Sequence, residues 1–254
     1  MDNNFLAFFV VFHEDIFPNI YKNISKKNLD YLYFYGVKKE TEHKVKQLLY
    51  ERELPIYEPI WQKLKYNEAS SLIHIYKNNF HKNYKYIGFI QYDMKITNET
   101  FDYVEYISNH DSNAIFYFDF FKWAFLGGQI TIIKDFPQFE AGLKTYNRFF
   151  NTDITPFQLI QAKMNIGNTF IISSQLFDKM MSWLSQYCIE NMNLDNLIDK
   201  ENNIPFNPGH IFEALTGMFF AAEVVQGNAR YYKLACSDYN DKKYDNEGKV
   251  SDFS

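Results

Sequence analysis

Short apolar runs alternate with polar stretches along this chain. Three runs in its first hundred residues have the length of β-strands: residues 5–12 (FLAFFVVF), 29–37 (LDYLYFYGV) and 86–93 (YIGFIQYD). Residues 68–79 (EASSLIHIYKNN) instead carry apolar positions at helical spacing. A strand that is apolar without alternation indicates burial on both faces, as in a parallel sheet covered by helices. The pattern therefore predicts an α/β fold with a mostly parallel central sheet flanked by helices.

The rest of the chain continues this alternation. Its expected elements are a strand or aromatic-lined wall at residues 114–121, an apolar run after a Gly-Gly hinge at residues 126–133, a strand at residues 169–172, a helix capped by Ser173 or Ser174, and a helix within residues 207–225. The end of the chain is polar, which is typical of a frayed or loosely docked terminus. We therefore expect one domain over residues 1–236 and a polar tail over residues 237–254.

Polar groups follow three of the predicted strands. They are His13-Glu14-Asp15, Tyr35-Gly36 and Gln91-Tyr92-Asp93. In parallel sheets covered by helices, ligands bind beyond the carboxyl ends of the strands. We therefore expect these groups to converge on one crevice.

Composition excludes some classes of function. The 254 residues include 26 basic and 31 acidic side chains, and this net charge of −5 disfavours a nucleic-acid partner. The arginines are Arg52, Arg148 and Arg230, too few for bidentate recognition of phosphates or guanines. With Cys188 and Cys236 alone, a disulfide framework is not expected, which favours a reducing, cytoplasmic setting.

The apolar runs are too short to cross a membrane. None reaches the roughly 18 uninterrupted apolar residues of a membrane span, and Asp2 stands where a signal peptide needs a basic flank. We expect a protein without a transmembrane segment, for which peripheral association with a membrane stays open. The abundance of Asn, Lys, Ile and Tyr is typical of an AT-rich genome and is compatible with a viral or bacterial host context.

Four blocks in order carry a resemblance to a known family. They are NEASSLIHIYKN, YIGFIQYDMKI, MNIGNTFIISSQLFDKMMSWL and GHIFEALTGMFFA. Together they resemble the capsular-polysaccharide-type glycosyltransferases, a family similar to the GT-A nucleotide-sugar transferases, over roughly residues 5–223. The fitting positions are Glu68, Gly88, Gly167, Asn168, Phe170, Trp183 and Glu213.

The resemblance implies both a fold and an activity. It implies a GT-A-like, Rossmann-related fold. It also implies transfer of a sugar from a UDP- or GDP-sugar donor to a saccharide acceptor, in glycan or polysaccharide synthesis. Two other classes stay open: a carbohydrate- or nucleotide-binding module with the same fold, and a sugar nucleotidyltransferase. The latter is disfavoured because no glycine-rich loop follows the first strand, where His13-Glu14-Asp15 would repel a triphosphate.

The turn after the third strand departs from the family pattern. Many relatives carry a His-Tyr-Arg-Arg turn where this chain has Gln91-Tyr92-Asp93-Met94. The turn here resembles a degenerate Asp-x-Asp element, which implies that Asp93 meets a Mn²⁺ or Mg²⁺ ion on the donor diphosphate. Such a cation stabilises the leaving diphosphate as a Lewis acid. His210 is a further candidate ligand and favours Mn²⁺. The alternative for Asp93 is a solvated turn residue or a helix cap.

Glu213 is the candidate catalytic base for the acceptor hydroxyl. We expect it in the first turn of the last predicted helix, where the helix dipole favours its ionised form, on the same face as His210. The alternative for Glu213 is a glutamate that merely stabilises the helix. The alternative for His210 is an ordinary surface histidine.

The remaining candidates concern substrate contacts. For the donor, Phe12 or Tyr35 is expected to stack on the base, His13 or Glu14 to reach its edge, and Gln91 to bond a ribose hydroxyl. Tyr92 shares that turn and is assigned to the donor with it. Glu68 is expected either to contact the donor or to cap its helix. For the acceptor, we assign Asp119, beside an aromatic series, and Asn168. Core packing is the alternative for the aromatic residues.

Overall fold

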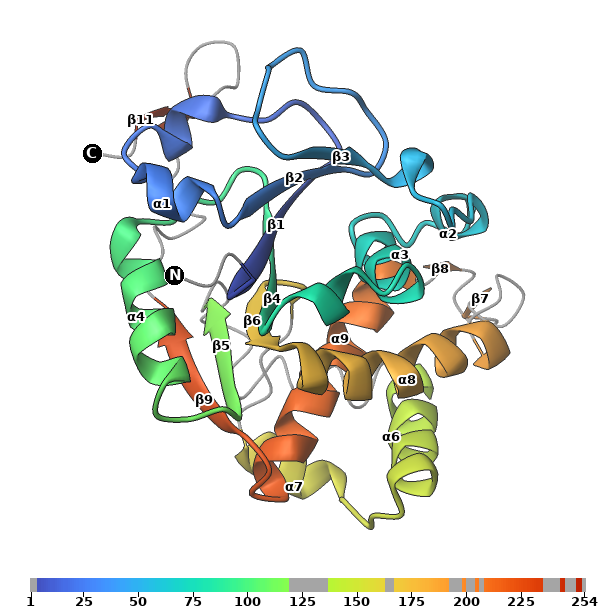
Figure 1. The fold of residues 1–254 in the computed structure, drawn as a ribbon. Coiled ribbons are helices and arrows are strands. Elements are labelled where there is room, and N and C mark those ends of the chain that lie inside the picture. The colour runs from blue at the N-terminus through green and yellow to red at the C-terminus, as the bar shows by residue number, and fades with distance from the viewer. Residues whose placement is uncertain are drawn as a thin grey trace.

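A seven-stranded sheet forms the centre of the molecule, with the strand order β3-β2-β1-β4-β6-β5-β9 (Figure 1). The structure is a computed structural model that describes residues 4–118, 137–162, 167–191, 198–199, 204–205, 208–234, 243–244 and 250–252. The strands of the sheet are β1 (Leu6–Phe12), β2 (Leu32–Gly36), β3 (Leu48–Tyr50), β4 (Tyr86–Gln91), β5 (Ala114–Phe118), β6 (Phe170–Ser173) and β9 (Arg230–Leu234).

Helices flank this sheet. The α-helices are α1 (Lys26–Leu29), α2 (Ile60–Lys63), α3 (Ala69–Lys77), α4 (Asn98–Ser108), α6 (Pro137–Phe150), α7 (Pro156–Gln161), α8 (Ser174–Asn191) and α9 (Pro208–Val225). Short 3₁₀ turns occur at η1 (Pro18–Tyr21), η2 (Glu51–Glu53) and η3 (Phe80–Asn83). Two small antiparallel pairs lie apart from the main sheet: β7 (Ile198–Asp199) with β8 (Ile204–Pro205), and β10 (Lys243–Tyr244) with β11 (Val250–Asp252).

Most neighbouring strands of the sheet run parallel. β1 lies between β2 and β4 and is parallel to both, and the pairs β2–β3 and β5–β9 are also parallel. β6 is antiparallel to both of its neighbours, β4 and β5. The predicted α/β fold with a mostly parallel sheet is therefore confirmed. The short apolar sequence of β6 does not indicate that this strand runs antiparallel to its neighbours.

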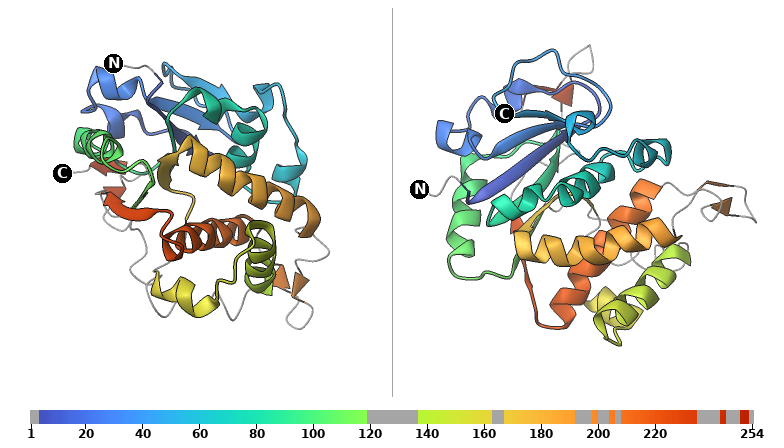
Figure 2. Two further views of the ribbon diagram at one scale, coloured as in Figure 1. Left: turned by 60° about the horizontal axis from the view of Figure 1, so that its bottom comes forward. Right: turned by 45° about the vertical axis from the view of Figure 1, so that its right-hand side comes forward.

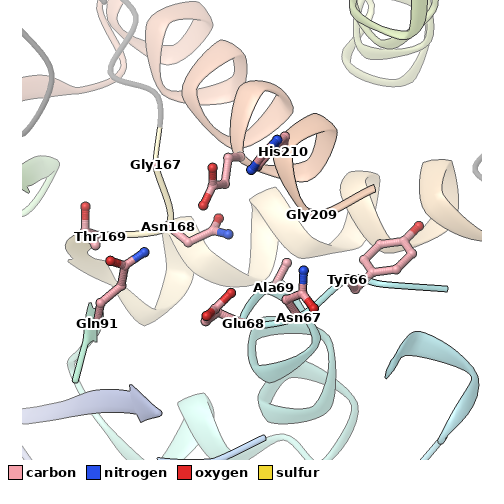
Figure 3. Close-up of a pocket in the computed structure, with 11 residues that line it drawn as sticks. Tyr66, Asn67, Glu68, Ala69, Gln91, Gly167, Asn168, Thr169, Gly209 and His210 are labelled. Carbon is pink, nitrogen blue, oxygen red and sulfur yellow. The ribbon is translucent and has the colours of Figure 1, made fainter. Parts of the chain in front are cut away.

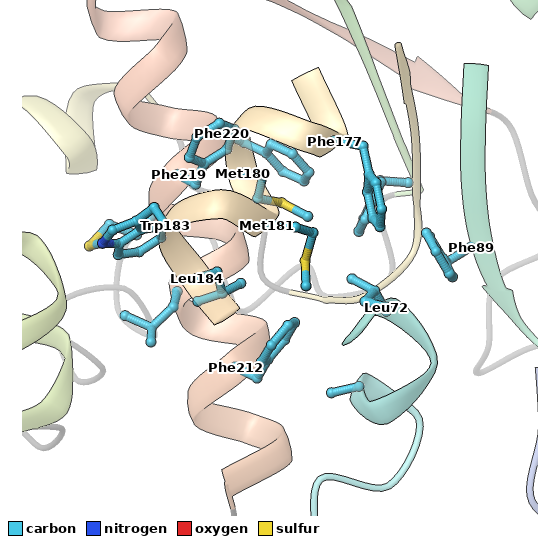
Figure 4. Packing of buried hydrophobic residues seen from close by; sticks show 14 of the residues in the cluster. Leu72, Phe89, Phe177, Met180, Met181, Trp183, Leu184, Phe212, Phe219 and Phe220 are labelled. Carbon is cyan, nitrogen blue, oxygen red and sulfur yellow. The ribbon is translucent and has the colours of Figure 1, made fainter. Parts of the chain in front are cut away.

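The sheet separates two hydrophobic cores. All seven residues of β1 are buried, because successive side chains of a strand point to opposite faces and both faces of this strand are covered. The first core, on the side of α3, α8 and α9, includes Phe89, Phe177, Trp183 and Phe219 (Figure 4). Phe9 of β1 also belongs to it. The second core, on the side of α4, includes Phe8, Phe12, Phe34, Phe101 and Phe118. Figure 2 shows these two helical layers on opposite sides of the sheet.

The predicted elements of the first hundred residues are confirmed with boundaries shifted by up to three residues. The runs at residues 5–12, 29–37 and 86–93 form β1, β2 and β4, and α3 lies within residues 68–79. The choice between a strand and an aromatic wall at residues 114–121 is settled for its first five residues, which form β5.

Later predictions are also confirmed where the structure describes the chain. The predicted strand at residues 169–172 is β6, and the last predicted helix is α9. Ser173 is the cap of α8, since its Oγ accepts a hydrogen bond from the backbone N–H of Leu176 at 3.2 Å. The run at residues 126–133 lies outside the described residues, and the division at residue 236 stays a prediction.

None of the helices in the described part of the chain combines the length and the apolar character needed to cross a lipid bilayer.

Candidate functional site

A cavity of about 330 Å³ opens at the carboxyl end of β4, between the start of α3 and the start of α9 (Figure 3). It is lined by Tyr66, Asn67, Glu68, Ala69, Gln91, Gly167, Asn168, Thr169, Gly209, His210 and Glu213. This location follows the rule that ligands bind beyond the carboxyl ends of parallel strands. Five residues predicted as functional line it together: Glu68, Gln91, Asn168, His210 and Glu213.

The sheet topology brings these segments together. β4 ends at Gln91, and its antiparallel partner β6 begins at Phe170, which pairs with Phe89. The turn at Gly167 and Asn168 therefore lies beside the end of β4 because β6 runs in the opposite direction. The α3 and α9 helices complete the cavity with their amino ends.

His13 and Glu68 form an ion pair at the edge of this cavity. His13 follows β1 directly, and its Nδ1 lies 2.5 Å from Oε1 of Glu68. Contact with Glu68 and its charge raise the pKa of His13 in spite of partial burial. Burial alone would raise the pKa of Glu68, but the contact with His13 and the nearby positive charges outweigh it and hold this pKa below its usual value. Glu68 is thus held in its charged form.

Glu68 is not a capping residue in the usual sense. It occupies the N-cap position of α3, but its side chain makes no capping hydrogen bond to the helix. Its carboxylate contacts His13 instead. Of the two predicted roles, the structure disfavours the cap and leaves the substrate contact as the role to test.

Asn67 shapes the wall beside Glu68. Its φ of 51° lies in the left-handed region, which asparagine tolerates better than most residues. Its carbonyl oxygen accepts hydrogen bonds from Nε2 of Gln62 at 3.1 Å and from Oγ of Ser70 at 2.8 Å. Ser70 Oγ also donates to the buried carboxylate of Glu51 at 2.6 Å. This network fixes the backbone that presents Asn67 and Glu68 to the cavity.

Glu213 lies in the second turn of α9 rather than the first, because the helix begins at Pro208. The prediction that the helix dipole favours the ionised form of Glu213 is therefore wrong. The pKa of its carboxyl group is raised instead of lowered. Burial, and secondly the negative charge of Glu68, raise the pKa of Glu213 to about 7. A carboxyl group with this pKa can accept or release a proton near neutral pH. Its position beside His210 on the cavity wall is as expected.

Two amides contribute neutral polar groups to the cavity. Gln91 closes β4, and Asn168 follows Gly167. Within the part of the chain that the structure describes, the Oδ1 atom of Asn168 is buried without a hydrogen-bond partner. A buried acceptor without a partner is costly unless a ligand or water supplies a donor. Asn168 is therefore suited to bind a hydroxyl group.

Other predicted residues do not line the cavity. Tyr35 is fully buried in the first core, where burial and then the charge of Glu51 raise its pKa. Tyr92 stacks on Phe17 at 5.7 Å between ring centroids and meets the ring of His13 edge-on at 5.2 Å. Asp119 lies outside the described residues.

Asp93 lies in the turn that follows β4, outside the cavity lining that includes Gln91. The strand ends at Gln91, and the chain then turns, with the N–H of Met94 donating to the carbonyl oxygen of Gln91 at 3.1 Å. Asp93 is 7% exposed, and its charge, second to burial, raises the pKa of Tyr21 in the second core. Asp93 does not belong to the cavity lining, whereas His210 does.

The predicted metal ligands are therefore not brought to one cavity. Among the residues that the structure describes, no three His, Cys, Asp or Glu side chains are grouped so that they could hold a metal ion. The arrangement does not fit the expected pair Asp93 and His210, and dependence on Mn²⁺ or Mg²⁺ stays a prediction.

Comparison with solved structures identifies a similar fold. The apo structure of WbbM, described as a bifunctional glycosyltransferase, matches with a TM-score of 0.51 and 14% sequence identity. The match covers 92% of this chain. This chain thus shares the fold of a glycosyltransferase. It spans 45% of the length of the WbbM chain. No model of a protein family matches the sequence, and neither does any curated protein.

Several residues around this cavity had no role predicted from the sequence. Tyr66 and Asn67 precede the predicted helix and were assigned no role, and Thr169 was treated only as the start of a strand. Lys38, two residues beyond β2, donates from Nζ to Oδ1 of Asn67 at 2.5 Å. Its position after a strand was a usable signal, because the polar groups at the other strand ends were considered for the same reason.

Proposed function

We propose that this chain is a glycosyltransferase that moves a sugar from a nucleotide-diphosphate donor to a saccharide acceptor, with Glu213 as the catalytic base. The observation that carries the proposal is a carboxyl group with a pKa raised to about 7 in a cavity at the carboxyl end of β4. The similarity in fold to WbbM, described as a bifunctional glycosyltransferase, supports the same class of reaction.

The cavity lining suits a sugar. Amide and carboxylate groups, which bond hydroxyls, come from Asn67, Gln91, Asn168 and Glu68. A small set of polar groups in a partly apolar hollow is typical of a site for a small ligand. The volume of about 330 Å³ lies at the lower end of the range for such sites, which favours a single sugar unit over a whole nucleotide sugar.

The proposed reaction is a direct displacement at the anomeric carbon. The acceptor oxygen forms a bond to that carbon, the bond from the carbon to the diphosphate oxygen breaks, and its electron pair leaves with the diphosphate. The acceptor proton passes to a carboxylate oxygen of Glu213. The pKa near 7 leaves a large fraction of Glu213 ionised at neutral pH while keeping it basic enough to accept this proton. Such a displacement inverts the configuration, so the stereochemistry of the product tests the role of Glu213.

Other expectations belong to this proposal as well. We expect a GT-A-like arrangement, a UDP- or GDP-sugar donor and a role in glycan or polysaccharide synthesis, as the resemblance in sequence implies. We also expect a divalent cation to assist, although neither the displacement nor the proton transfer to Glu213 depends on it. If a cation bound, the carboxylate or imidazole of the site and the donor phosphates would be its ligands.

The test is a transfer assay on the full chain. UDP-, GDP- and dTDP-sugars are incubated with a panel of saccharide acceptors, with Mn²⁺ and with EDTA, and the release of nucleoside diphosphate and the glycosylated product are measured. The Glu213→Gln variant is expected to lose at least about a hundredfold in turnover, the lower range for general base catalysis. Glu140→Gln, at an exposed position of α6, is the control and is expected to retain activity.

Three other outcomes of this assay would change the proposed function or the assigned base. Turnover by Glu213→Gln equal to that of the unaltered chain would contradict the assigned base. Binding of donors without release of nucleoside diphosphate would favour the binding module over the enzyme. Formation of a nucleotide sugar with release of pyrophosphate, from a nucleoside triphosphate and a sugar 1-phosphate, would favour the nucleotidyltransferase.

A further inference from the structure

The charges around the cavity are distributed unevenly. Its lining within the described residues contains the carboxyl groups of Glu68 and Glu213 but no lysine or arginine. A donor diphosphate carries several negative charges, and close approach to an ionised carboxylate in a partly buried site is costly. The diphosphate is therefore expected to bind outside the cavity lining, but close enough to remain bonded to a sugar inside the cavity.

Lys38 lies at such a place. β2 is the direct neighbour of β1, Gly36 pairs with Phe12, and the N–H of Val37 donates to the carbonyl oxygen of Phe12 at 3.0 Å. The chain after β2 consequently passes beside His13. The Nζ atom of Lys38 then reaches Oδ1 of Asn67, a residue of the cavity wall, at 2.5 Å.

The partner of Lys38 is an amide rather than a carboxylate. The ion pairs among the described residues use other cations, among them Lys27, Lys46, Lys77 and Lys179, each with its own carboxylate. Within the described ranges of the chain, Lys38 contacts the neutral amide of Asn67 and forms no ion pair. Its side chain is also exposed, so that an anion can approach it from solvent.

Lys38 also interacts electrostatically with the His13–Glu68 pair. Its charge acts to lower the pKa of both His13 and Glu68. The contact with Glu68 keeps His13 a stronger base than usual, so that His13 adds positive charge on the same side. Lys38 and a protonated His13 carry two positive charges, which Glu68 and Glu14 match in number, but Glu68 lines the cavity and Glu14 does not.

We propose that Lys38, at the edge of the cavity beside Asn67 and the His13–Glu68 pair, binds the diphosphate of the donor and stabilises it as the leaving group. This inference rests on the proposed glycosyl transfer. As the bond from the anomeric carbon to the diphosphate oxygen breaks, its electron pair moves onto that oxygen. The ammonium group of Lys38 stabilises the added negative charge by a charge-assisted hydrogen bond, and no proton needs to move.

The test measures binding of product-like probes without a sugar. Calorimetric titrations compare UDP, GDP and dTDP with uridine, guanosine and thymidine, each in EDTA so that no cation bridges protein and phosphate. The variants are Lys38→Gln, Lys38→Arg and the control Lys39→Gln, which removes the same charge from the next exposed position. Thermal melts of the variants verify that they fold like the unaltered chain.

We expect one nucleoside diphosphate to bind more tightly than its nucleoside. Lys38→Gln is expected to weaken that diphosphate about tenfold and leave the nucleoside unchanged, as for loss of one charged hydrogen bond. Lys39→Gln should change the affinity less than about twofold, and Lys38→Arg should retain most of it. A steeper salt dependence in the unaltered chain than in Lys38→Gln is expected for the same reason.

Other results would overturn the inference. Equal losses in Lys38→Gln and Lys39→Gln would show a diffuse charge effect, and equal losses for diphosphate and nucleoside would show a contact elsewhere. Failure of all three diphosphates to bind the unaltered chain would also contradict it. The proposed transfer is tested separately. If the unaltered chain turns over a donor and Lys38→Gln has no effect, the proposed function stands and the role of Lys38 is refuted. Loss of diphosphate affinity in Lys38→Gln with full turnover by Glu213→Gln supports Lys38 and refutes the assigned base.

Discussion

The carboxyl groups of Glu68 and Glu213 line the same cavity, and their pKa values are shifted in opposite directions. The contact with His13 holds the pKa of Glu68 below its usual value against the effect of burial. Glu213 has no such compensation, since the shift to about 7 comes from burial and from the charge of Glu68. Two carboxyl groups with pKa values driven apart by their surroundings are the usual basis for dividing acid–base roles.

The pH dependence of transfer should depend on the charge of Glu68. In the unaltered chain we expect turnover to rise with pH through an apparent pKa of about 7, as Glu213 ionises. Glu68→Gln removes the negative neighbour, so the midpoint should move to lower pH. It should stay above the usual value for glutamate, because burial is the larger cause. The measurement is the pH profile of turnover at saturating donor.

His13→Gln is the matched control for that experiment. It breaks the same 2.5 Å contact but leaves the negative charge on Glu68, so the midpoint for Glu213 should not move to lower pH. Equal downward shifts in Glu68→Gln and His13→Gln would show that the contact, rather than the charge, sets the pKa of Glu213.

Stability should also vary with pH through Glu213. A carboxyl group whose pKa is raised in the folded state contributes stability that is fully present below the unfolded value, here 4.5, and is lost as pH rises through about 7. Glu213→Gln does not titrate. Its free energy of unfolding relative to the unaltered chain should therefore increase between pH 4.5 and 7, by about 3 kcal/mol in total, and then level off.

Urea denaturation at several pH values measures this difference. The control Glu140→Gln, at the exposed start of α6, should show a difference from the unaltered chain that is nearly constant with pH. If the difference for Glu213→Gln were equally constant, the raised pKa would be wrong, and the argument for Glu213 as the base would lose its main support.

Contiguous apolar runs explain why much of the sheet could be predicted. β1 and β4 are buried on both faces, so their sequences are apolar almost throughout. α4 and β9 were missed for the opposite reason. α4 buries few apolar side chains, mainly Phe101 and Val104, and in β9 (RYYKL) Leu234 is the one buried residue. Pairing direction depends on tertiary packing, and the antiparallel β6 therefore could not be predicted from its four residues.

The site was predicted in part because the strand-end rule is topological. It selects Gln91, and two helices supply Glu68, at the start of α3, and Glu213, in the second turn of α9. The rule does not say where the strand stops. Gln91 and Asp93 are two residues apart, a spacing that gives one face in a strand, but the chain turns after Gln91. The pKa of Glu213 was also beyond prediction, since burial by distant segments overrides the position in the helix.

The buried carboxylate of Glu223, away from the cavity, leads to a prediction about stability. Glu223 is 1% exposed, and its two oxygens accept hydrogen bonds from Lys179 at 2.8 and 2.6 Å. Tyr146 also donates to it at 2.8 Å. Lys179→Met removes the cation and leaves a buried charge, which should destabilise the chain by about 3 kcal/mol, the lower end for a broken buried pair because other donors remain.

Lys144→Met, at an exposed position of α6, makes the same chemical change without a buried partner and should be nearly neutral. The double variant Lys179→Met with Glu223→Met should recover part of the loss, because no charge is then left unpaired. Equal melting temperatures for the two single variants would show that Lys179 contributes nothing to holding the Glu223 carboxylate.

The packing of β4 against its neighbours gives a final prediction, at Gly88. A Cβ atom at this position would lie 2.6 Å from Cγ1 of Ile171, 2.8 Å from Cδ2 of Phe8 and 3.0 Å from the carbonyl oxygen of Phe170. The first two atoms belong to fully buried side chains and the third to the backbone of β6, so making room requires repacking of the core or a shift of the sheet. Gly88→Ala should therefore destabilise the chain by about 1–3 kcal/mol, the usual cost of overpacking.

Gly227 provides a contrast for this experiment. Its φ of 72° is left-handed, but a Cβ atom there meets no atom within 4 Å. Gly227→Asn introduces a residue that also tolerates a left-handed backbone, and it should cost well under 1 kcal/mol of stability. Because β4 ends at Gln91, strain at Gly88 should also weaken donor binding at the cavity, and Gly227→Asn should not. A Gly88→Ala variant as stable as the unaltered chain would mean that β1 and β6 can separate locally without cost.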